Sequence, residues 1–510
     1  MTLTLRSACD TLEEAGLLHE VATPDGWTLD AGALEGADTP FTAITYDSRA
    51  VVPGALMVCK GNFKAEYLKD AAARGMAAYV AERDYPEVTG VPGLVVDNAT
   101  KALSLLAQEF YGHPERRLTL IGITGTKGKT TTAYLTHAIL AAVSGNKAAL
   151  FSSVDNCVDG VHYVESDLTT PESLDAVRMM AEAVEHGMEY LVMEVSSQAY
   201  KVNRVYGLEF DAAAFLNISP DHISPIEHPT FEDYLWCKRQ LVRHTKRLTL
   251  GVPGPYAPLI EQDAARRDVP VDTFSLEDEQ ATVFARPVDA SHSAFDMLLR
   301  GKSIGELSLA MDGDFNIANA AAALALADSV GVDVADPRAL DAMRGVRISG
   351  RMEQTRDAHS DTIAIVDYAH NYASVKALLD YVDQRYGERH PRITLVTGSA
   401  GGKAIDRRHE IVEAAQGRID QFIFTQEDTN TEPYEAICQQ MFDFVTAPDV
   451  RRAIVLDRTE AIERAVDMAR DSGRFNVVLV IGKGEERWIK DRNKHVPYEG
   501  DDAVVARLFK

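Results

Sequence analysis

A glycine-rich segment with two lysines offers phosphate-binding chemistry. It runs Gly122-Ile123-Thr124-Gly125-Thr126-Lys127-Gly128-Lys129-Thr130-Thr131-Thr132. Glycines let backbone N–H groups close around phosphate oxygens, Lys129 can neutralise the β- and γ-phosphates, and the Thr130 hydroxyl can bind Mg²⁺. The strict GxxxxGK[ST] spacing is missed by one residue, because Ile123 stands where the first glycine belongs. The segment indicates a nucleoside triphosphate but not the reaction, and a chance Gly/Lys/Thr-rich turn is the alternative.

Three further side chains could complete a catalytic site, although none is decisive alone. Glu194 ends an apolar strand, where a carboxylate is well placed to hold Mg²⁺ beside phosphates; a solvent-exposed glutamate is the alternative. His222 would by itself be an ordinary loop histidine. Lys238 lies in a predicted amphipathic helix, where a lysine is normally solvated. Their chemistry depends on which elements bring them together.

The elements around the phosphate-binding segment are those of a parallel sheet. A buried-strand pattern at Leu118–Ile121 precedes the segment, and a helical pattern from Thr131 to Val143 follows it. A second strand is predicted at Tyr190–Val195. Continuous rather than alternating apolarity indicates a parallel sheet covered on both faces.

Two other regions flank this unit. The first holds apolar runs at Ala77–Ala81 and Gly93–Val96, a helical stretch from Thr100 to Tyr111, and a Gly/Pro linker at 112–117. The third starts near Ile348 and alternates strands with helices, which predicts a doubly wound domain. Its predicted elements are the strands Ile363–Val366, Ile393–Val396, Phe422–Thr425, Ala453–Leu456 and Val477–Ile481, and the helices Tyr372–Tyr386 and Glu460–Arg470.

Length and pattern together predict an α/β protein of three domains. A smaller N-terminal α/β domain is expected at 1–114. A central domain at 115–346 is expected to be an ATPase domain with a P-loop-type parallel sheet. A C-terminal doubly wound, Rossmann-like domain is expected at 347–510.

Composition excludes some classes of protein. The 510 residues include 52 basic and 77 acidic side chains, a formal charge of −25, which argues against general affinity for nucleic acid. Five scattered cysteines without CxxC spacing fit a reducing cytoplasm. The acid-containing stretch Met1–Val21 is not a secretory signal, and no run of about 18 apolar residues predicts a membrane span. A cytoplasmic monomer is expected.

The phosphate-binding segment resembles the G-T-x-G-K-T pattern of the Mur ligase family. Met193–Gln198 resembles the family's M-E-x-S-S motif, Phe215–His222 its N-x-x-x-D-H signature, and Tyr234–Lys238 its Y-x-x-x-K motif. Three more motifs, F-N-x-x-N, G-R-M-E and D-Y-A-H, are matched by Phe315–Asn319, Ser349–Glu353 and Val366–His370. Because the motifs follow the family's order along the chain, their joint match is far more specific than any one of them.

The resemblance implies an ATP-dependent ligase with two Mg²⁺ ions. ATP would phosphorylate a terminal carboxylate, and an incoming amine would attack the acyl phosphate. The implied ATP-binding residues are Gly125, Thr126, Lys127, Gly128, Lys129, Thr130, Thr131, Asn319, Arg351 and Asp367. The implied metal ligands are Thr130, Glu194, His222 and Lys238, the lysine after carbamylation by CO₂. The implied catalytic residues are Lys129, Glu194, His222 and Lys238.

Several segments resemble the MurE-type branch of the family, the UDP-N-acetylmuramoyl-tripeptide synthetases of peptidoglycan synthesis. Tyr46–Arg49 with Val52–Gly54 resembles the D-S-R-x-V-x-P-G motif of the uridine-nucleotide pocket. Thr169–Glu172 resembles the T-T-P motif, which alone would indicate only a turn. The implied substrate is UDP-N-acetylmuramoyl-L-alanyl-D-glutamate. Its implied contacts are Ser48, Arg49, Thr169, Thr170, Ser196 and Arg204.

The stretch matching the amino-acid pocket departs from the branch that adds meso-diaminopimelate. That branch carries D-N-P-R, whose arginine would bind the second carboxylate, whereas Thr425–Pro433 contains no arginine. Glu427 and Asp428, with Gly482–Glu486 reading G-K-G-E-E instead of G-K-G-H-E, suit a side-chain ammonium. The hypothesis is therefore L-lysine. Ornithine is the next candidate, because one methylene changes discrimination by only about 1–3 kcal/mol, and diaminopimelate follows.

Other segments also resemble the lysine-adding branch. They are Met193–Lys201, Leu216–Lys238 and Gly398–Lys403, the last followed by Arg407 and Arg408. In this resemblance an arginine holds the α-carboxylate of the amino acid. The implied amino-acid contacts are Arg408, Asp428, Asn430 and Glu486.

Three competing interpretations are disfavoured. A folylpolyglutamate synthase would not be expected to carry the D-S-R-x-V-x-P-G segment, and a P-loop kinase would have regular loop spacing. A nucleotide-binding scaffold would not need Lys129, Glu194, His222 and Lys238 together. Because Arg351 and Arg408 lie in the third region and Lys129 in the second, the last domain is predicted to swing in when ATP and substrate bind.

Overall fold

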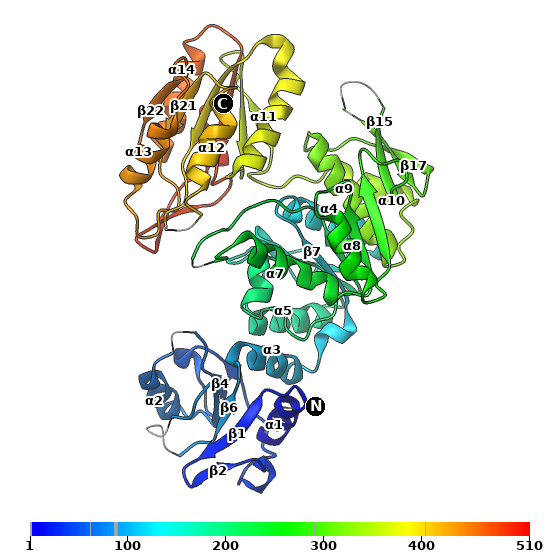
Figure 1. The fold of residues 1–510 in the computed structure, drawn as a ribbon, viewed down its shortest axis with the longest axis vertical. Helices are drawn as coiled ribbons and strands as arrows, with labels where there is room; N and C mark the ends of the chain where they lie inside the picture. Colours follow the sequence, from blue (N-terminus) through cyan, green and yellow to red (C-terminus); the bar gives the residue numbers. More distant parts are fainter. Residues whose placement is uncertain are drawn as a thin grey trace.

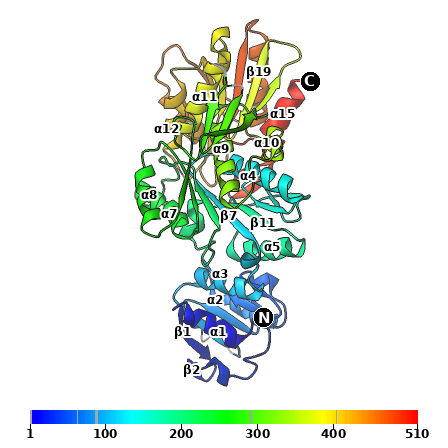
Figure 2. The same cartoon turned by 90° about the vertical axis from the view of Figure 1, so that its right-hand side faces the viewer.

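Three β-sheets follow one another along the chain in the computed structural model, which describes residues 3–61, 63–85, 90–225, 227–288, 292, 294–402 and 404–510. Figure 1 shows three bodies in a row, with the N-terminal one at one end and the C-terminal one at the other. Figure 2 shows the same order after a quarter turn. The predicted three-domain α/β architecture is confirmed, whereas the exact boundaries at 114 and 346 stay predictions.

The N-terminal domain is built on a six-stranded mixed sheet. The strands in spatial order are β2 (Gly26–Thr28), β1 (Leu18–Thr23), β6 (Gly93–Val96), β5 (Ala78–Ala81), β4 (Leu56–Val58) and β3 (Ile44–Thr45). The helices α1 (Leu5–Glu14) and α3 (Ala99–Phe110) pack on one face, and α2 (Ala65–Ala73) packs on the other. Side chains alternate between the faces, so Leu56 and Val58 lie in one core and Met57 in the other.

The central domain contains an eleven-stranded sheet whose middle is parallel, as predicted. The spatial order is β10 (Tyr163–Glu165), β9 (Asp155–Cys157), β8 (Ala148–Phe151), β11 (Tyr190–Glu194), β7 (Thr119–Thr124), β12 (Ala212–Phe215), β13 (Leu248–Gly251), β14 (Val271–Ser275), β15 (Val283–Pro287), β16 (Phe295–Leu299) and β17 (Lys302–Leu307). Strands β8 to β15 run parallel in this order, and antiparallel strands extend both edges. The phosphate-binding segment follows β7, in the middle of the sheet.

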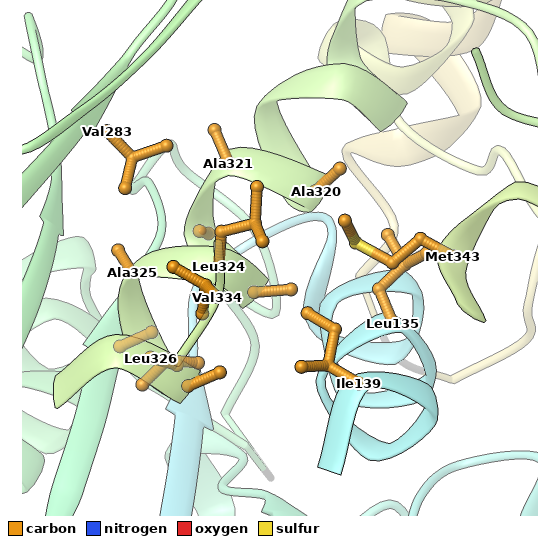
Figure 3. Close-up of a cluster of buried hydrophobic side chains, with 14 of the residues drawn as sticks. Leu135, Ile139, Val283, Ala320, Ala321, Leu324, Ala325, Leu326, Val334 and Met343 are labelled. Carbon is orange, nitrogen blue, oxygen red and sulfur yellow. The ribbon is translucent and has the colours of Figure 1, made fainter. Parts of the chain in front are cut away.

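A buried helix pair anchors the phosphate-binding segment. The helix α4 (Lys129–Ser144) packs against α9 (Asp314–Ser329), and Figure 3 shows Leu135 and Ile139 of α4 facing Leu324 and its neighbours on α9. Most of α9 is alanine and leucine, buried all round, which is the pattern of a helix inside a core rather than on a surface. Close packing of this kind holds the start of α4 fixed relative to α9.

The C-terminal domain has the predicted doubly wound arrangement. Its sheet order is β18 (Glu353–Arg356), β19 (Thr362–Asp367), β23 (Asn476–Ile481), β20 (Arg392–Thr397), β21 (Gln421–Phe424) and β22 (Arg451–Ile454), parallel except for β18. One face carries α11 (Tyr372–Tyr386), α12 (Arg407–Ala415) and α13 (Tyr434–Phe444), and the other carries α14 (Arg458–Arg470) and α15 (Asp501–Leu508). The predicted strand 453–456 begins two residues earlier, because the strand includes the exposed Arg451 and Arg452.

Specific polar contacts join neighbouring domains. Between the N-terminal and central domains, the Tyr46 hydroxyl donates to Asp175 Oδ2 at 2.7 Å, and Ser104 Oγ donates to the Tyr206 carbonyl at 2.7 Å. Asp175 belongs to α5 (Ser173–Glu185). No helix in the described part of the chain is long and apolar enough to cross a membrane.

Candidate active site between the central and C-terminal domains

The phosphate-binding segment forms a tight loop between β7 and α4. Gly128 has φ +86°, and a Cβ there would lie 2.3 Å from Asn319 Oδ1, so only glycine fits. The helix begins at Lys129, two residues earlier than predicted, which puts Thr130 and Thr131 in its first turn. The positive end of α4 therefore points at the loop, as an anion site requires.

Glu194 is buried at the end of β11 rather than exposed to solvent. Its Oε1 accepts a hydrogen bond from the Ser153 backbone N–H at 2.8 Å, and Ser153 Oγ lies 3.0 Å from Thr130 Oγ1. Ser153, which the motif patterns did not single out, thus joins two candidate metal ligands. No pattern near Ser153 marks it, because the contact arises only from the β8–β11 pairing.

The segment that follows β12 also holds the phosphate-binding loop, through four hydrogen bonds. Asn217 accepts from the Lys127 N–H at 3.0 Å and donates to the Lys127 carbonyl at 3.1 Å. The Thr126 hydroxyl donates to the Ser219 carbonyl at 3.1 Å and accepts from the Ser219 N–H at 3.0 Å. The segment containing the N-x-x-x-D-H signature is therefore bound directly to the phosphate-binding loop.

Two lysines converge on one carbonyl of the loop. Lys129 Nζ donates to the Gly125 carbonyl at 3.0 Å, and Lys238 Nζ donates to the same oxygen at 2.8 Å. Lys238 lies on α7 (Phe231–Arg243) and is 2% exposed, so the solvated-lysine interpretation is wrong. Burial, with the charge of Lys129 nearby, holds the pKa of Lys238 well below its usual range. This shift favours the neutral form of the amine.

His222 lies beside the same aromatic ring as Lys238. The Tyr234 ring faces Lys238 Nζ at 4.8 Å and stacks on the His222 ring at a centroid separation of 6.0 Å. His222 Nδ1 lies 3.1 Å from Glu227 Oε1. Burial lowers the pKa of His222, so its imidazole is the neutral form that can bind a metal.

The carboxylate of Asp221, in the central domain, accepts hydrogen bonds from side chains of the C-terminal domain. Asp221 Oδ1 accepts from Arg407 Nη2 at 2.6 Å, and Asp221 Oδ2 accepts from Asn371 Nδ2 at 2.8 Å. Lys127 Nζ lies 3.6 Å from Asp221 Oδ2 and 3.0 Å from His370 Nε2. Burial alone would raise the pKa of Asp221, but the charges of Lys127 and Arg407 hold it well below its usual range. Burial lowers the pKa of Lys127 to about 8.

The two predicted nucleotide contacts of the C-terminal domain lie beside this junction. The Arg351 guanidinium lies 4.6 Å from the Tyr368 ring centroid, and its Nε has no hydrogen-bond partner in the described structure. Asp367 accepts from the backbone N–H groups of Met352 at 2.9 Å and Ala369 at 2.8 Å. Burial raises the pKa of Asp367. After burial, the nearby charge of Arg351 also lowers the pKa of Lys127 and of Lys129, and the movement of the last domain stays a prediction.

The predicted contacts for the muramoyl substrate fall into two groups. Thr170 Oγ1 donates to the Glu194 carbonyl at 2.8 Å and accepts from the Ser196 N–H at 3.0 Å. Arg204 Nη2 donates to Glu172 Oε1 at 2.9 Å, beside Thr169 and Thr170. Ser48 and Arg49 lie apart in the N-terminal domain, where the exposed Arg49 pairs with Asp47.

The predicted amino-acid contacts surround a lysine of the chain itself. Lys483 is 1% exposed, and its Nζ donates to Asp428 Oδ1 at 2.9 Å and to Glu486 Oε2. Glu486 also accepts from the Tyr368 hydroxyl at 2.6 Å. The structure therefore brings Asp428 and Glu486 together, but with an internal ammonium between them.

Two other acids of this region each have one buried carboxylate oxygen that no described residue contacts through a hydrogen bond. Glu427 Oε2 and Glu485 Oε2 are buried without a hydrogen-bond partner in the described structure. Burial raises the pKa of each carboxyl group to about 7. A buried acceptor without a partner is costly, so each carboxyl group is ready to accept a donor from a ligand.

The hydrogen bonds of the Arg408 side chain lie within the C-terminal domain. Arg408 is 1% exposed and binds Glu432 through two bonds, from Nη1 at 2.8 Å and from Nη2 at 2.6 Å. Asn430, with φ +54°, donates from Nδ2 to the Gly401 carbonyl at 2.5 Å. Lys403, the other basic residue of this predicted loop, lies outside the described residues.

Comparisons with known proteins identify the family. Residues 123–327 match the family described as Mur ligase middle domain, and residues 350–484 match the Mur ligase, glutamate ligase domain. A UDP-N-acetylmuramyl-tripeptide synthetase of Bifidobacterium longum (strain NCC 2705) is 59% identical over 515 residues, covering 100% of both chains. The UDP-N-acetylmuramoyl-L-alanyl-D-glutamate--L-lysine ligase of Enterococcus faecalis (strain ATCC 700802 / V583) is 40% identical, covering 99% of this chain and 98% of that one.

A solved structure has the same fold from end to end. It is titled as a UDP-N-acetylmuramoyl-L-alanyl-D-glutamate--2,6-diaminopimelate ligase and matches with a TM-score of 0.65 at 20% identity, over 100% of this chain and 99% of that one. At this identity it supports the fold alone. The two family matches and the full-length relatives together show that the chain belongs to the Mur ligase family of ATP-dependent, amide-bond-forming ligases.

Proposed function

We propose that this protein uses ATP to join L-lysine to UDP-N-acetylmuramoyl-L-alanyl-D-glutamate through an acyl phosphate in peptidoglycan synthesis. The observation that carries the proposal is the convergence of Lys129 and Lys238 on the Gly125 carbonyl. Lys129 is the lysine of a phosphate-binding loop, and Lys238 is a buried lysine whose pKa is lowered. A nucleotide-binding scaffold would have no use for the second. Relatives with tripeptide-synthetase names over their whole length support the same assignment.

In this proposal the phosphate-binding loop holds the ATP phosphates. The residues concerned are Gly125, Thr126, Lys127, Gly128, Lys129, Thr130 and Thr131, with Asn319 packed against the loop. Lys127 and Lys129 offer positive charge where negative charge builds on the transferring phosphoryl group. Arg351 adds a guanidinium from the C-terminal domain, and its free Nε supports a role in binding an anion. Asp367 holds the Arg351 segment through the Met352 N–H.

Two Mg²⁺ ions complete the proposed site. The Thr130 hydroxyl and the Glu194 carboxylate are the hard oxygen donors that Mg²⁺ prefers, so they fit the first ion. His222 and Lys238 fit a second ion only in part, because an amine nitrogen is a poor ligand for a hard cation. Addition of CO₂ to the neutral form of the Lys238 amine, with loss of one proton, forms a carbamate whose oxygens do fit. When bound, the ions would supply charge stabilisation at the phosphoryl group.

The carboxylate substrate is proposed to enter between the N-terminal and central domains. The Thr170 hydroxyl is hydrogen-bonded to the Ser196 N–H and to the carbonyl of Glu194, so a peptide held there would end near the proposed metal ligand Glu194. Arg204, held by Glu172, offers a cation for a substrate carboxylate. Ser48 and Arg49 are proposed to hold the uridine nucleotide at the far end of the substrate. The proposed contacts of the muramoyl peptide are therefore Ser48, Arg49, Thr169, Thr170, Ser196 and Arg204.

The preference for a diamino acid rests on the acids of the C-terminal domain. Asp428 and Glu486 are already neutralised in part by Lys483, so a second ammonium needs a further acid. Glu427 supplies it, because its buried Oε2 lacks a partner and an ammonium would ionise it. Asn430 is a further proposed contact, and Thr425–Pro433 contains no arginine that would bind a second carboxylate. Arg408 is proposed to bind the α-carboxylate, which requires Glu432 to give way.

The reaction is proposed to take place in the cytoplasm on a monomer. All five cysteines are free and buried, as is usual in a reducing compartment. Phosphate release from ATP tests the proposed function directly. With UDP-muramoyl-dipeptide present, omission of the amino acid should abolish release, and lysine should restore it best among lysine, ornithine and diaminopimelate. A preference for diaminopimelate would overturn the pocket argument, and release without the UDP substrate would overturn the ligase assignment.

A further inference from the structure

A buried histidine outside the predicted site links three segments that carry proposed metal ligands. His228 is 0% exposed and lies between the loop of His222 and the start of α7. Its Nε2 lies 2.9 Å from Ser197 Oγ, and its Nδ1 lies 2.6 Å from Asp233 Oδ2. Ser197 follows Glu194 by three residues, and Asp233 precedes Lys238 on the same helix. One imidazole thus bridges all three segments.

The direction of both hydrogen bonds follows from the charges around them. Asp233 Oδ2 also accepts from Lys201 Nζ at 2.5 Å, so the carboxylate is ionised and only accepts. His228 Nδ1 must therefore carry the proton and donate to Asp233. His228 Nε2 is then the acceptor, and the Ser197 hydroxyl donates to it. The imidazole is held in one tautomer and one orientation.

The backbone and ring of His228 also fix the loop that carries His222. The His228 N–H donates to the His222 carbonyl at 3.3 Å, and the His228 carbonyl accepts from the Ser224 N–H at 2.8 Å. The ring packs edge-on against Tyr234 at a centroid separation of 5.3 Å. Tyr234 in turn stacks on His222 and donates from its hydroxyl to Thr126 Oγ1 at 3.1 Å. Movement of His228 would therefore shift His222 relative to the phosphate-binding loop.

We propose that His228 is a positioning residue which, through Ser197 and Asp233, holds Glu194, His222 and Lys238 in the arrangement that binds metal. This inference rests on the proposed function, because it assumes that these three residues are ligands. Groups that orient metal ligands typically contribute 10–100-fold to metal affinity. His228 touches no substrate in this proposal and acts only through the residues it orients.

A metal bound by His228 itself is the competing interpretation. The ligand atoms of His228, Asp233 and Cys237 all lie within 4.8 Å of one another. The Lys201 ammonium on Asp233, however, already occupies the position of a cation at that carboxylate. Both His228 nitrogens are also engaged. The geometry therefore favours a hydrogen-bonded relay over a metal centre.

The experiment measures Mn²⁺ binding by electron paramagnetic resonance in the presence of ADP, independently of activity. His228→Ala should weaken Mn²⁺ binding about tenfold or more, with ADP affinity unchanged. His228→Asn, whose amide can still donate to Asp233, should retain part of the affinity. Ser197→Ala removes one bond and leaves the imidazole in place, so it should weaken Mn²⁺ binding several-fold even if the His228 variants fail to fold. His137→Asn is the matched control, because His137 is also buried and bonded, to the Ala148 carbonyl at 3.0 Å.

The outcomes separate this inference from the proposed function. Glu194→Gln should lose Mn²⁺ affinity if the proposed metal ligands are correct, and wild-type affinity in that variant would overturn the proposed function. A different result is that Glu194→Gln loses affinity while His228→Ala and Ser197→Ala bind Mn²⁺ as the wild type does. That result would overturn the positioning role of His228 and leave the proposed function standing. Stoichiometric zinc that His228→Ala releases would also overturn the positioning role, in favour of the metal centre.

Discussion

Arg407 Nη2 lies 2.6 Å from Asp221 Oδ1, which joins the first turn of α12 to the loop before α7. Both side chains are buried at the junction of the C-terminal and central domains. Asp221 receives Asn371 from the same C-terminal domain and the ammonium of Lys127 from the phosphate-binding loop. One carboxylate therefore couples the docking of the C-terminal domain to the loop that is proposed to bind ATP.

Asp221→Asn should loosen this docking. Removal of one partner leaves Arg407 buried without its counter-charge, which typically costs about 3–5 kcal/mol, and undocking of the domain relieves the cost. Small-angle scattering of the free protein should show a larger radius of gyration than the wild type, and ATP with substrate should reduce it. Asp336→Asn, which removes an exposed pair with Arg338, is the control and should change nothing. An unchanged radius of gyration in Asp221→Asn would contradict the coupling.

Lys238 should form a carbamate. Burial and the charge of Lys129 lower its pKa, which favours the neutral amine, and only a neutral amine adds CO₂. In ¹³CO₂-equilibrated protein, a carbamate carbon should give a ¹³C resonance that Lys238→Met lacks, and that variant should lose at least about a hundredfold in kcat. Lys147→Met alters an exposed lysine paired with Glu189 and should keep both the signal and the activity. A signal that persists in Lys238→Met would assign the carbamate elsewhere.

Glu432→Gln should lower the KM for the amino acid. Glu432 accepts hydrogen bonds from both Nη1 and Nη2 of Arg408. A neutral amide at this position would compete less well than a carboxylate with the α-carboxylate of the substrate for the guanidinium. Steady-state kinetics at saturating ATP should show a fall in KM of several-fold with little change in kcat. The KM for the UDP substrate serves as the internal control and should not move. An unchanged KM for the amino acid, with a lower melting temperature, would mean that Arg408 only supports its loop.

Glu427 should make the stability of the protein depend on pH. Burial raises its pKa from 4.5 to about 7, so between these values the folded state holds a proton that the unfolded chain releases. Stability therefore falls as pH rises from about 4.5 to about 7, by at most about 3.4 kcal/mol at 1.36 kcal/mol per pKa unit. Glu427→Gln should match the wild type at pH 5 and exceed it at pH 8.

Calorimetry at pH 5 and pH 8 tests whether the stability falls as pH rises. Glu189→Gln, on a surface ion pair, should leave the pH dependence within about 0.5 kcal/mol of the wild type. Added lysine should stabilise the wild type more than Glu427→Gln at pH 8, because the substrate ammonium favours the ionised carboxylate. Equal pH dependence in wild type and Glu427→Gln would refute the assignment of the raised pKa.

Local sequence determined several strands of each sheet, four helices with their approximate bounds, and the phosphate-binding loop. The helix predicted at Tyr372–Tyr386 has those bounds, and the strand predicted at Val477–Ile481 begins one residue earlier. Apolar runs and glycine positions carry this information within a few residues. The helix α9 was not predicted, because its alanines and leucines are buried all round and leave no amphipathic period. The antiparallel strands β16 and β17 also lacked a clear signal.

Tertiary structure alone decided how the site residues meet. Family motifs pointed to Lys129, Glu194, His222 and Lys238, yet no local pattern indicated that Ser153 would join Thr130 to Glu194. Arg407 and Asp221 lie 186 residues apart, so their contact depends on how two separately folded domains dock. Burial, which lowers the pKa of Lys238 and leaves Glu427 Oε2 without a hydrogen-bond partner among the described residues, is a property of the packing around a residue. The sequence by itself determined which chemical groups the site contains, whereas the surrounding fold decided which groups meet and how far their pKa values shift.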